Sequence, residues 1–186
     1  MENLLILSPI QADQRIDFPA LIQPLTQFGL LGEPFTYQGT PHYRPGESFL
    51  QLITYLGCSP VISLGEPGTT GDEFAHIALV NTETTHLLHG DNVKSPRCPK
   101  CRHIYETWQE ELPQWERQAV ICPSCELEGP IQALHWRQCA GYGRSFIKIW
   151  GVFEGEALPS DTFLEKLNSD TGVAWDYFYI QLQGAK

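Results

Sequence analysis

The stretch CPKCRHIYETWQEELPQWERQAVICPSC, residues 98–125, decides how the middle of this chain folds. Its two ends are Cys-x-x-Cys pairs, Cys98 with Cys101 and Cys122 with Cys125, with 20 residues between them. Two thiolates at this spacing lie on one tight turn and can face one ion, and the intervening Pro and Ser residues favour such a turn. Two turns supply a tetrahedron of sulfur ligands. The sequence therefore predicts one Zn²⁺ per chain, bound by these four cysteines.

Four thiolates fill the coordination sphere of zinc and leave no position for water or substrate, which indicates a structural rather than a catalytic metal. Redox-active pairs or an iron site are the alternatives, although a thioredoxin-like motif needs one pair at the start of a helix in a βαβ unit. The other two cysteines, Cys58 and Cys139, are expected to be thiols outside the metal site. Disulfides are disfavoured because the chain shows no export signal and is large enough to form a core without them.

Residues 95–136 resemble a zinc ribbon, with Cys98, Cys101, Cys122 and Cys125 as the ligands. The resemblance implies that each Cys-x-x-Cys knuckle joins two strands of a small sheet, and the expected strands are 104–108, 118–121 and 130–136. It covers less than a quarter of the chain. Zinc ribbons occur in transcription, translation, scaffolding proteins and enzymes, so the family does not define a function.

Outside this segment, the periodicity of apolar residues predicts an α+β fold with a mostly antiparallel sheet and a few helices. The expected helices are 19–28, 47–56 and 162–167, the expected strands are 60–64, 74–80, 84–88, 145–153 and 174–182, and 33–46 is expected to be a loop. The last strand is apolar on both faces, which favours a central place in the sheet. Residues 1–90 and 140–186 are expected to form one discontinuous domain, with the zinc ribbon inserted as residues 91–139.

The chain is acidic, with 12 Lys and Arg against 22 Asp and Glu, a formal charge of −10. Such a chain repels the phosphates of nucleic acids. The middle of the chain differs, because residues 90–140 carry six basic and seven acidic side chains. Four of these cations surround the first knuckle: Lys94, Arg97, Lys100 and Arg102. They either balance the negative charge of a thiolate-bound zinc or bind a partner.

The search for catalytic motifs gives no nucleophile elbow, P-loop or His-Glu-x-x-His sequence. The leading hypothesis is therefore a cytoplasmic, non-enzymatic adaptor that binds another protein, with Trp108 as a possible anchor beside the basic cluster. A ribbon that binds RNA or DNA is the alternative. An enzyme with a pocket near Arg144 or His76 and zinc as a staple is a third hypothesis. Apolar runs fall short of the ~18 residues of a membrane span, so no membrane partner is expected.

Overall fold

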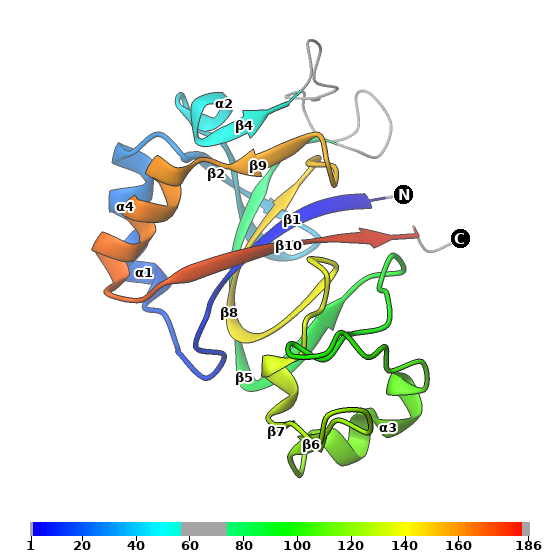
Figure 1. Cartoon of the computed structure of the whole chain (residues 1–186). Coiled ribbons are helices and arrows are strands. Elements are labelled where there is room, and N and C mark those ends of the chain that lie inside the picture. The colour runs from blue at the N-terminus through cyan, green and yellow to red at the C-terminus, as the bar shows by residue number, and fades with distance from the viewer. Residues whose placement is uncertain (1, 57–73, 184–186) are drawn as a thin grey trace.

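A curled, mostly antiparallel sheet forms the centre of the molecule in this computed structural model, which describes residues 2–56 and 74–183 (Figure 1). The predicted α+β class is confirmed. In the described residues the main sheet has six strands in the order β10-β1-β8-β5-β3-β2. The elements are β1 (Glu2–Pro9), α1 (Phe18–Gln27), β2 (Leu31–Tyr37), β3 (Thr40–Pro45), α2 (Phe49–Leu52), β4 (Ile53–Tyr55), β5 (Ile77–His89), α3 (Trp108–Trp115), β6 (Val120–Ile121), β7 (Glu128–Gly129), the 3₁₀ turn η1 (Ile131–Ala133), β8 (Ala140–Trp150), β9 (Ala157–Pro159), α4 (Asp161–Thr171) and β10 (Trp175–Leu182).

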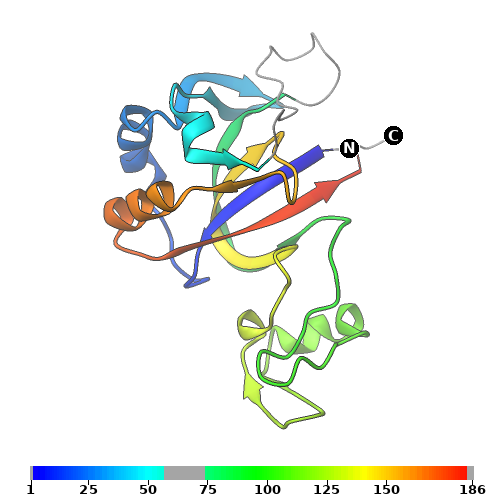
Figure 2. The same ribbon diagram turned by 45° about the horizontal axis from the view of Figure 1, so that its top comes forward.

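Strand β1 shows how the sheet is buried on two sides. Leu5 and Leu7 face the main core, where α1 and α4 lie side by side (Figures 1 and 2). Leu4 and Ile6 alternate with them and face a second apolar cluster around Phe146. Side chains of a strand point alternately to opposite faces, so a continuous apolar run requires cover on both.

The two long helices lie where their capping residues predict, although α4 runs to Thr171, four residues beyond the expected end at residue 167. In α1 the Asp17 side chain accepts a hydrogen bond from the backbone N–H of Ala20, at 3.4 Å. In α4 the Ser160 hydroxyl accepts from the N–H of Phe163, at 3.3 Å, and Gly172 ends the helix with φ +70°. A side-chain oxygen satisfies an N–H that has no partner in the first turn, and glycine adopts the left-handed C-terminal position without strain.

The expected loop 33–46 is wrong, because these residues form the hairpin β2–β3. Pro34 lies in the edge strand β2, where a missing N–H costs least, and Pro41 and Pro45 lie at or next to the ends of its neighbour β3. The turn consists of Gln38 and Gly39, which both have positive φ (48° and 79°), as a two-residue type I′ hairpin requires.

The strands predicted at 74–80 and 84–88 are one strand, β5, with a bulge. Asn81 pairs with Ser145 and His86 with Gly143, so the four residues between them oppose only Arg144 of β8. Strand β8 also begins earlier than predicted, at residue 140. The predicted helix 47–56 is a single turn, α2, followed by β4. Cys58 and the predicted strand 60–64 lie outside the described residues.

The last strand, β10, lies at an edge of the sheet and not at its centre, which corrects the expectation from its apolar pattern. Residues from both ends of segment 91–139 cover its outer side. The N–H of Gln181 donates to Asn92 Oδ1 at 2.9 Å, and the N–H of Tyr179 donates to the carbonyl of Gln138 at 2.8 Å. The edge is therefore covered, although no further strand pairs with it.

None of the helices in the described residues is long and apolar enough to cross a membrane.

Candidate metal centre

Residues 91–139, here called the cysteine module, extend from one end of the sheet on the side away from α1 and α4 (Figure 2). Their secondary structure differs from the expected strands. Residues 104–108 do not form a strand, and Trp108 begins the helix α3. The predicted strand 118–121 is reduced to β6, paired with β7, and 130–136 contains the 3₁₀ turn η1.

The residues of α3 form a helix for a physical reason that the expected strand pattern did not include. Trp108, Leu112 and Trp115 recur at the i, i+4, i+7 spacing of one helix face, and both tryptophans are buried. Glu110 and Glu111 lie in the first turn, where the helix dipole favours negative charge. The module thus combines two knuckles with a helix that covers them.

The first knuckle is closed by two backbone hydrogen bonds. The N–H of Arg102 donates to the carbonyl of Cys98 at 3.1 Å, and the N–H of Cys98 donates to the carbonyl of His103 at 2.9 Å. Arg102, directly after Cys101, has φ 65°. This bond pattern turns the backbone N–H groups of the knuckle toward the cysteine sulfur atoms.

The second knuckle repeats this geometry residue for residue. The N–H of Glu126 donates to the carbonyl of Cys122, and the N–H of Cys122 donates to the carbonyl of Leu127, both at 2.9 Å. Glu126, directly after Cys125, has φ 57°. Two segments of different sequence adopt one local structure, which is what two equivalent halves of one metal site require.

The four sulfur atoms converge. All four Sγ atoms of Cys98, Cys101, Cys122 and Cys125 lie within 4.8 Å of one another. Two pairs that cross between the knuckles are closer, with Cys98 and Cys125 at 3.7 Å and Cys101 and Cys122 at 3.5 Å. Sulfur ligands at ~2.3 Å from one tetrahedral ion lie ~3.8 Å apart, so the cluster could hold a metal ion.

The surroundings of Cys98 and Cys122 favour the thiolate form, the form that binds metals. At Cys101 the backbone N–H of His103 acts in the same direction, but burial and the neighbouring thiols outweigh it and raise the pKa to about 12. Burial opposes ionisation of Cys122, but the backbone N–H groups of Ser124 and Cys125 face its sulfur, and its pKa falls to about 6. The backbone N–H of Cys101 likewise lowers the pKa of Cys98. Cys98 and Cys122 are buried, whereas Cys101 is exposed. The cluster therefore has one face in the module core and one toward solvent.

The predicted anchor Trp108 is part of this core. It is 4% exposed and packs edge to face against Trp136 with ring centroids 5.3 Å apart. Tyr105 and Trp115 form a similar pair at 5.1 Å. The tryptophans of the module stabilise it from inside, and none of the three is an exposed anchor.

The four cations predicted beside the first knuckle have different surroundings. Lys94 is near Glu154, at 3.7 Å, with both side chains partly exposed. Arg97 is half-buried, and its backbone pairs with Ile104 and His135. The remaining two, Lys100 and Arg102, are exposed on the knuckle itself.

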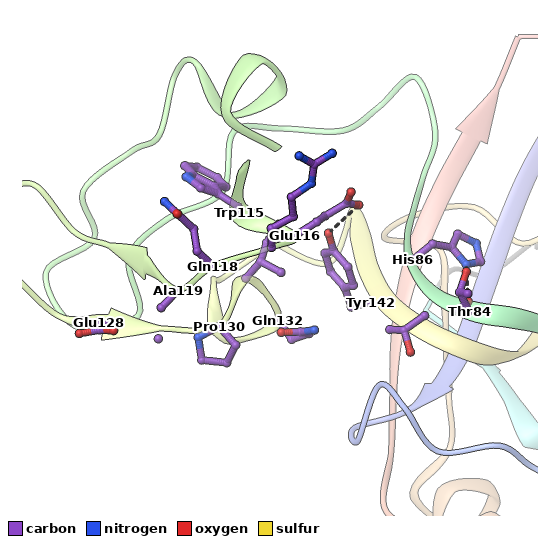
Figure 3. Close-up of a pocket in the computed structure, with 14 residues that line it drawn as sticks. Thr84, His86, Trp115, Glu116, Gln118, Ala119, Glu128, Pro130, Gln132 and Tyr142 are labelled. Carbon is purple, nitrogen blue, oxygen red and sulfur yellow. Dashed lines mark hydrogen bonds between the residues drawn. The ribbon is translucent and has the colours of Figure 1, made fainter. Parts of the chain in front are cut away.

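A groove of about 1050 Å³ separates the module from strands β5 and β8 (Figure 3). Its walls come from Thr84 to His86 on one side and from 115–119 and 128–132 on the other. At its base Tyr142 of β8 donates a hydrogen bond to Glu116 at 3.4 Å. Burial, and then the carboxylate of Glu116, raise the pKa of Tyr142, so the phenol stays protonated and acts as a donor.

Several functional features had no clear signal in the sequence. Arg102 and Glu126 have the left-handed backbone conformation, which a glycine in the sequence often indicates. Neither residue is glycine, so the sequence contains no sign of it. Asn92, which joins the module to β10, is one asparagine among ordinary loop residues. Only tertiary structure shows that these residues hold the knuckles and the base of the module.

Comparison with known proteins adds no family. No protein-family model, curated protein or solved structure matches this chain.

Proposed function

We propose that this protein is a non-enzymatic binding protein whose cysteine module, a zinc ribbon inserted into a discontinuous α+β domain, holds one structural Zn²⁺ and contacts another protein. The observation that carries the proposal is the convergence of four cysteine sulfur atoms within 4.8 Å. A sulfur-only tetrahedral set suits zinc, and it leaves no coordination position for a substrate.

Zinc explains how so small a module stays folded. Its core consists of few residues, chiefly three tryptophans, Tyr105, Val120 and Ile131. A unit of about 50 residues buries too little apolar surface for independent stability, and a metal that joins two distant knuckles compensates for this. The module is then a rigid platform.

The proposed contact surface lies around the knuckles, because apolar side chains are exposed there. Ile104, Ile121 and Leu127 are 42%, 63% and 37% exposed, respectively. Each of them lies within three residues of a metal-cluster cysteine. Exposed aliphatic side chains on a rigid support are typical of protein-binding surfaces.

The metal is tested by elemental analysis of the full chain purified without added metal. One zinc per chain is expected for the wild type, and both Cys98→Ser and Cys122→Ser should lose it. Cys139→Ser is the matched control, because this buried thiol donates to the carbonyl of Trp136 and lies outside the cluster. Retention of zinc by both ligand variants, or stoichiometric iron in place of zinc, would contradict the assignment.

The partner is tested by affinity capture from the native lysate with nuclease present. A stoichiometric protein partner should be lost in Ile121→Asp and kept in Leu50→Asp, a control with 51% exposure on the distant helix α2. Unchanged capture of the partner by Ile121→Asp would contradict the proposed surface. Binding that nuclease abolishes, and that Lys100→Glu and Arg102→Glu also abolish, would instead establish the nucleic-acid alternative.

A further inference from the structure

A second candidate site lies away from the cysteine module, on the face of the sheet opposite to α1 and α4. A pocket of about 380 Å³ opens between the tip of the β2–β3 hairpin and strands β5 and β8. Its walls include Glu2, Tyr37, His42, Lys148 and Trp150. A pocket of this size suits a small organic molecule.

Lys148 lies in the middle of this pocket's sheet wall. It pairs with Ile6 on one neighbouring strand and with Ala78 on the other, and both of these residues are buried. In the described part of the chain its amine makes no hydrogen bond or ion pair. Burial lowers the pKa of Lys148, which is the physical sign that its charge is poorly solvated.

Among residues 2–56 and 74–183, no carboxylate forms an ion pair with Lys148, although the chain has ten more acidic than basic residues. Glu2 also lines the pocket, but its Oε2 accepts a hydrogen bond from the indole N–H of Trp150 at 3.2 Å. A half-buried ammonium without a counter-charge is stabilised by an anion that enters the pocket.

His42 belongs to the opposite wall, and Thr40 fixes its orientation. The hydroxyl of Thr40 donates to the carbonyl of Tyr37 at 3.0 Å, so it accepts from His42 Nε2–H, also at 3.0 Å. His42 Nδ1 has no partner, but this atom is buried out of reach of a molecule in the pocket. The residue is 5% exposed, and burial lowers its pKa, which keeps the imidazole neutral. A neutral ring in this wall does not compete with Lys148 for an anion.

Two aromatic rings, those of Trp150 and Tyr37, contribute to the walls. Trp150 stacks on His76 with ring centroids 4.4 Å apart and an interplanar angle of 12°, which fixes the indole in place. Tyr37 packs edge to face on His42, at 5.5 Å. Fixed aromatic rings favour a ligand that itself contains a ring.

We propose that this pocket binds a small aromatic carboxylate, with Lys148 on the carboxylate and the rings of Trp150 and Tyr37 beside the ring of the ligand. The proposal does not depend on zinc or on the cysteine module.

The test uses 4-hydroxybenzoate as a probe and follows the indole N–H of Trp150 by NMR in the full-length protein. A saturable shift is expected. The uncharged probe 4-hydroxybenzamide should bind at least about tenfold more weakly, the loss that removal of one charged hydrogen bond produces.

Variants then assign the cation. Lys148→Met should weaken binding of 4-hydroxybenzoate to the same extent as loss of the probe's charge. Lys166→Met is the matched control, because Lys166 lies on α4 in an ion pair with Asp170. If Lys148→Met does not fold, the comparison of 4-hydroxybenzoate with 4-hydroxybenzamide on the wild type still tests the proposal. Equal affinity for the two probes, or no saturable shift at concentrations up to about 10 mM, overturns the proposal.

Discussion

Asn92 joins the cysteine module to the sheet, and its removal tests whether the module stabilises the edge of the domain. Its side-chain amide imitates a peptide group of a neighbouring strand: Nδ2 donates to the carbonyl of Tyr179 at 3.1 Å, and Oδ1 accepts from the N–H of Gln181 at 2.9 Å. Asn92→Ala removes both bonds. Each contributes ~0.5–1.5 kcal/mol net, and water can reach the edge once the side chain is gone, so the expected loss of unfolding free energy is ~1–2 kcal/mol.

Equilibrium unfolding in urea of the zinc-loaded protein measures this loss. Asn92→Leu has a similar volume without hydrogen bonds, so an equal loss in Leu and Ala variants assigns the effect to the bonds. Gln109→Ala, an exposed change on α3, is the control. Hydrogen exchange gives the local result: the amide of Gln181 should lose protection, while that of Ile180, which is paired with Leu4 of β1, keeps it.

The reasoning is refuted if both Asn92 variants unfold within ~0.3 kcal/mol of the wild type and the Gln181 amide remains protected. Such a result would mean that Asn92 does not stabilise β10, which would then depend on β1 and on backbone bonds such as that from Tyr179 to Gln138.

Three further predictions concern strain, close packing and pH. Arg102→Gly and Glu126→Gly should each stabilise the loaded knuckles by up to ~1 kcal/mol, because glycine relieves their positive φ, and slower zinc loss to a chelator would show it. Gly141→Ala should destabilise by ~1–3 kcal/mol in thermal unfolding, since its Cβ would lie 2.4 Å from the ring of Phe178; an unchanged midpoint would contradict this packing. Burial lowers the pKa of His76 from 6.5 to about 4, so the unfolded chain takes up a proton in this window that the folded one resists. Stability should be full above pH 6.5 and fall toward pH 4 by up to ~1.4 kcal/mol per unit, a slope that His76→Phe reduces.

Local chemistry explains which elements the sequence predicted correctly. Asp17 and Ser160 cap their helices through atoms three residues away, and Gly172 ends α4 through its own backbone freedom. The pairing of cysteines within each knuckle is equally local. The convergence of the two knuckles is the arrangement that one metal ion bound by four thiolates would require.

Longer-range packing explains the errors. The hairpin β2–β3 contains prolines that break an isolated strand, but the sheet accepts them next to its edge. The alternation in 130–136 looked like a strand, although η1 forms there and Trp136 packs on Trp108. Local propensity does not predict these contacts, because the partners lie far away along the chain.

The sequence by itself determined which four cysteines converge, where the helix caps lie, and the α+β class, since each depends on residues close together or on overall periodicity. Only the tertiary structure decided that β10 is an edge strand covered by Asn92 and Gln138. It also decided that Trp108 is buried, and that Lys148 and His42 share a pocket. These features depend on which distant segments the folded chain brings into contact, and burial and hydrogen bonding across such contacts have no representation in a local pattern.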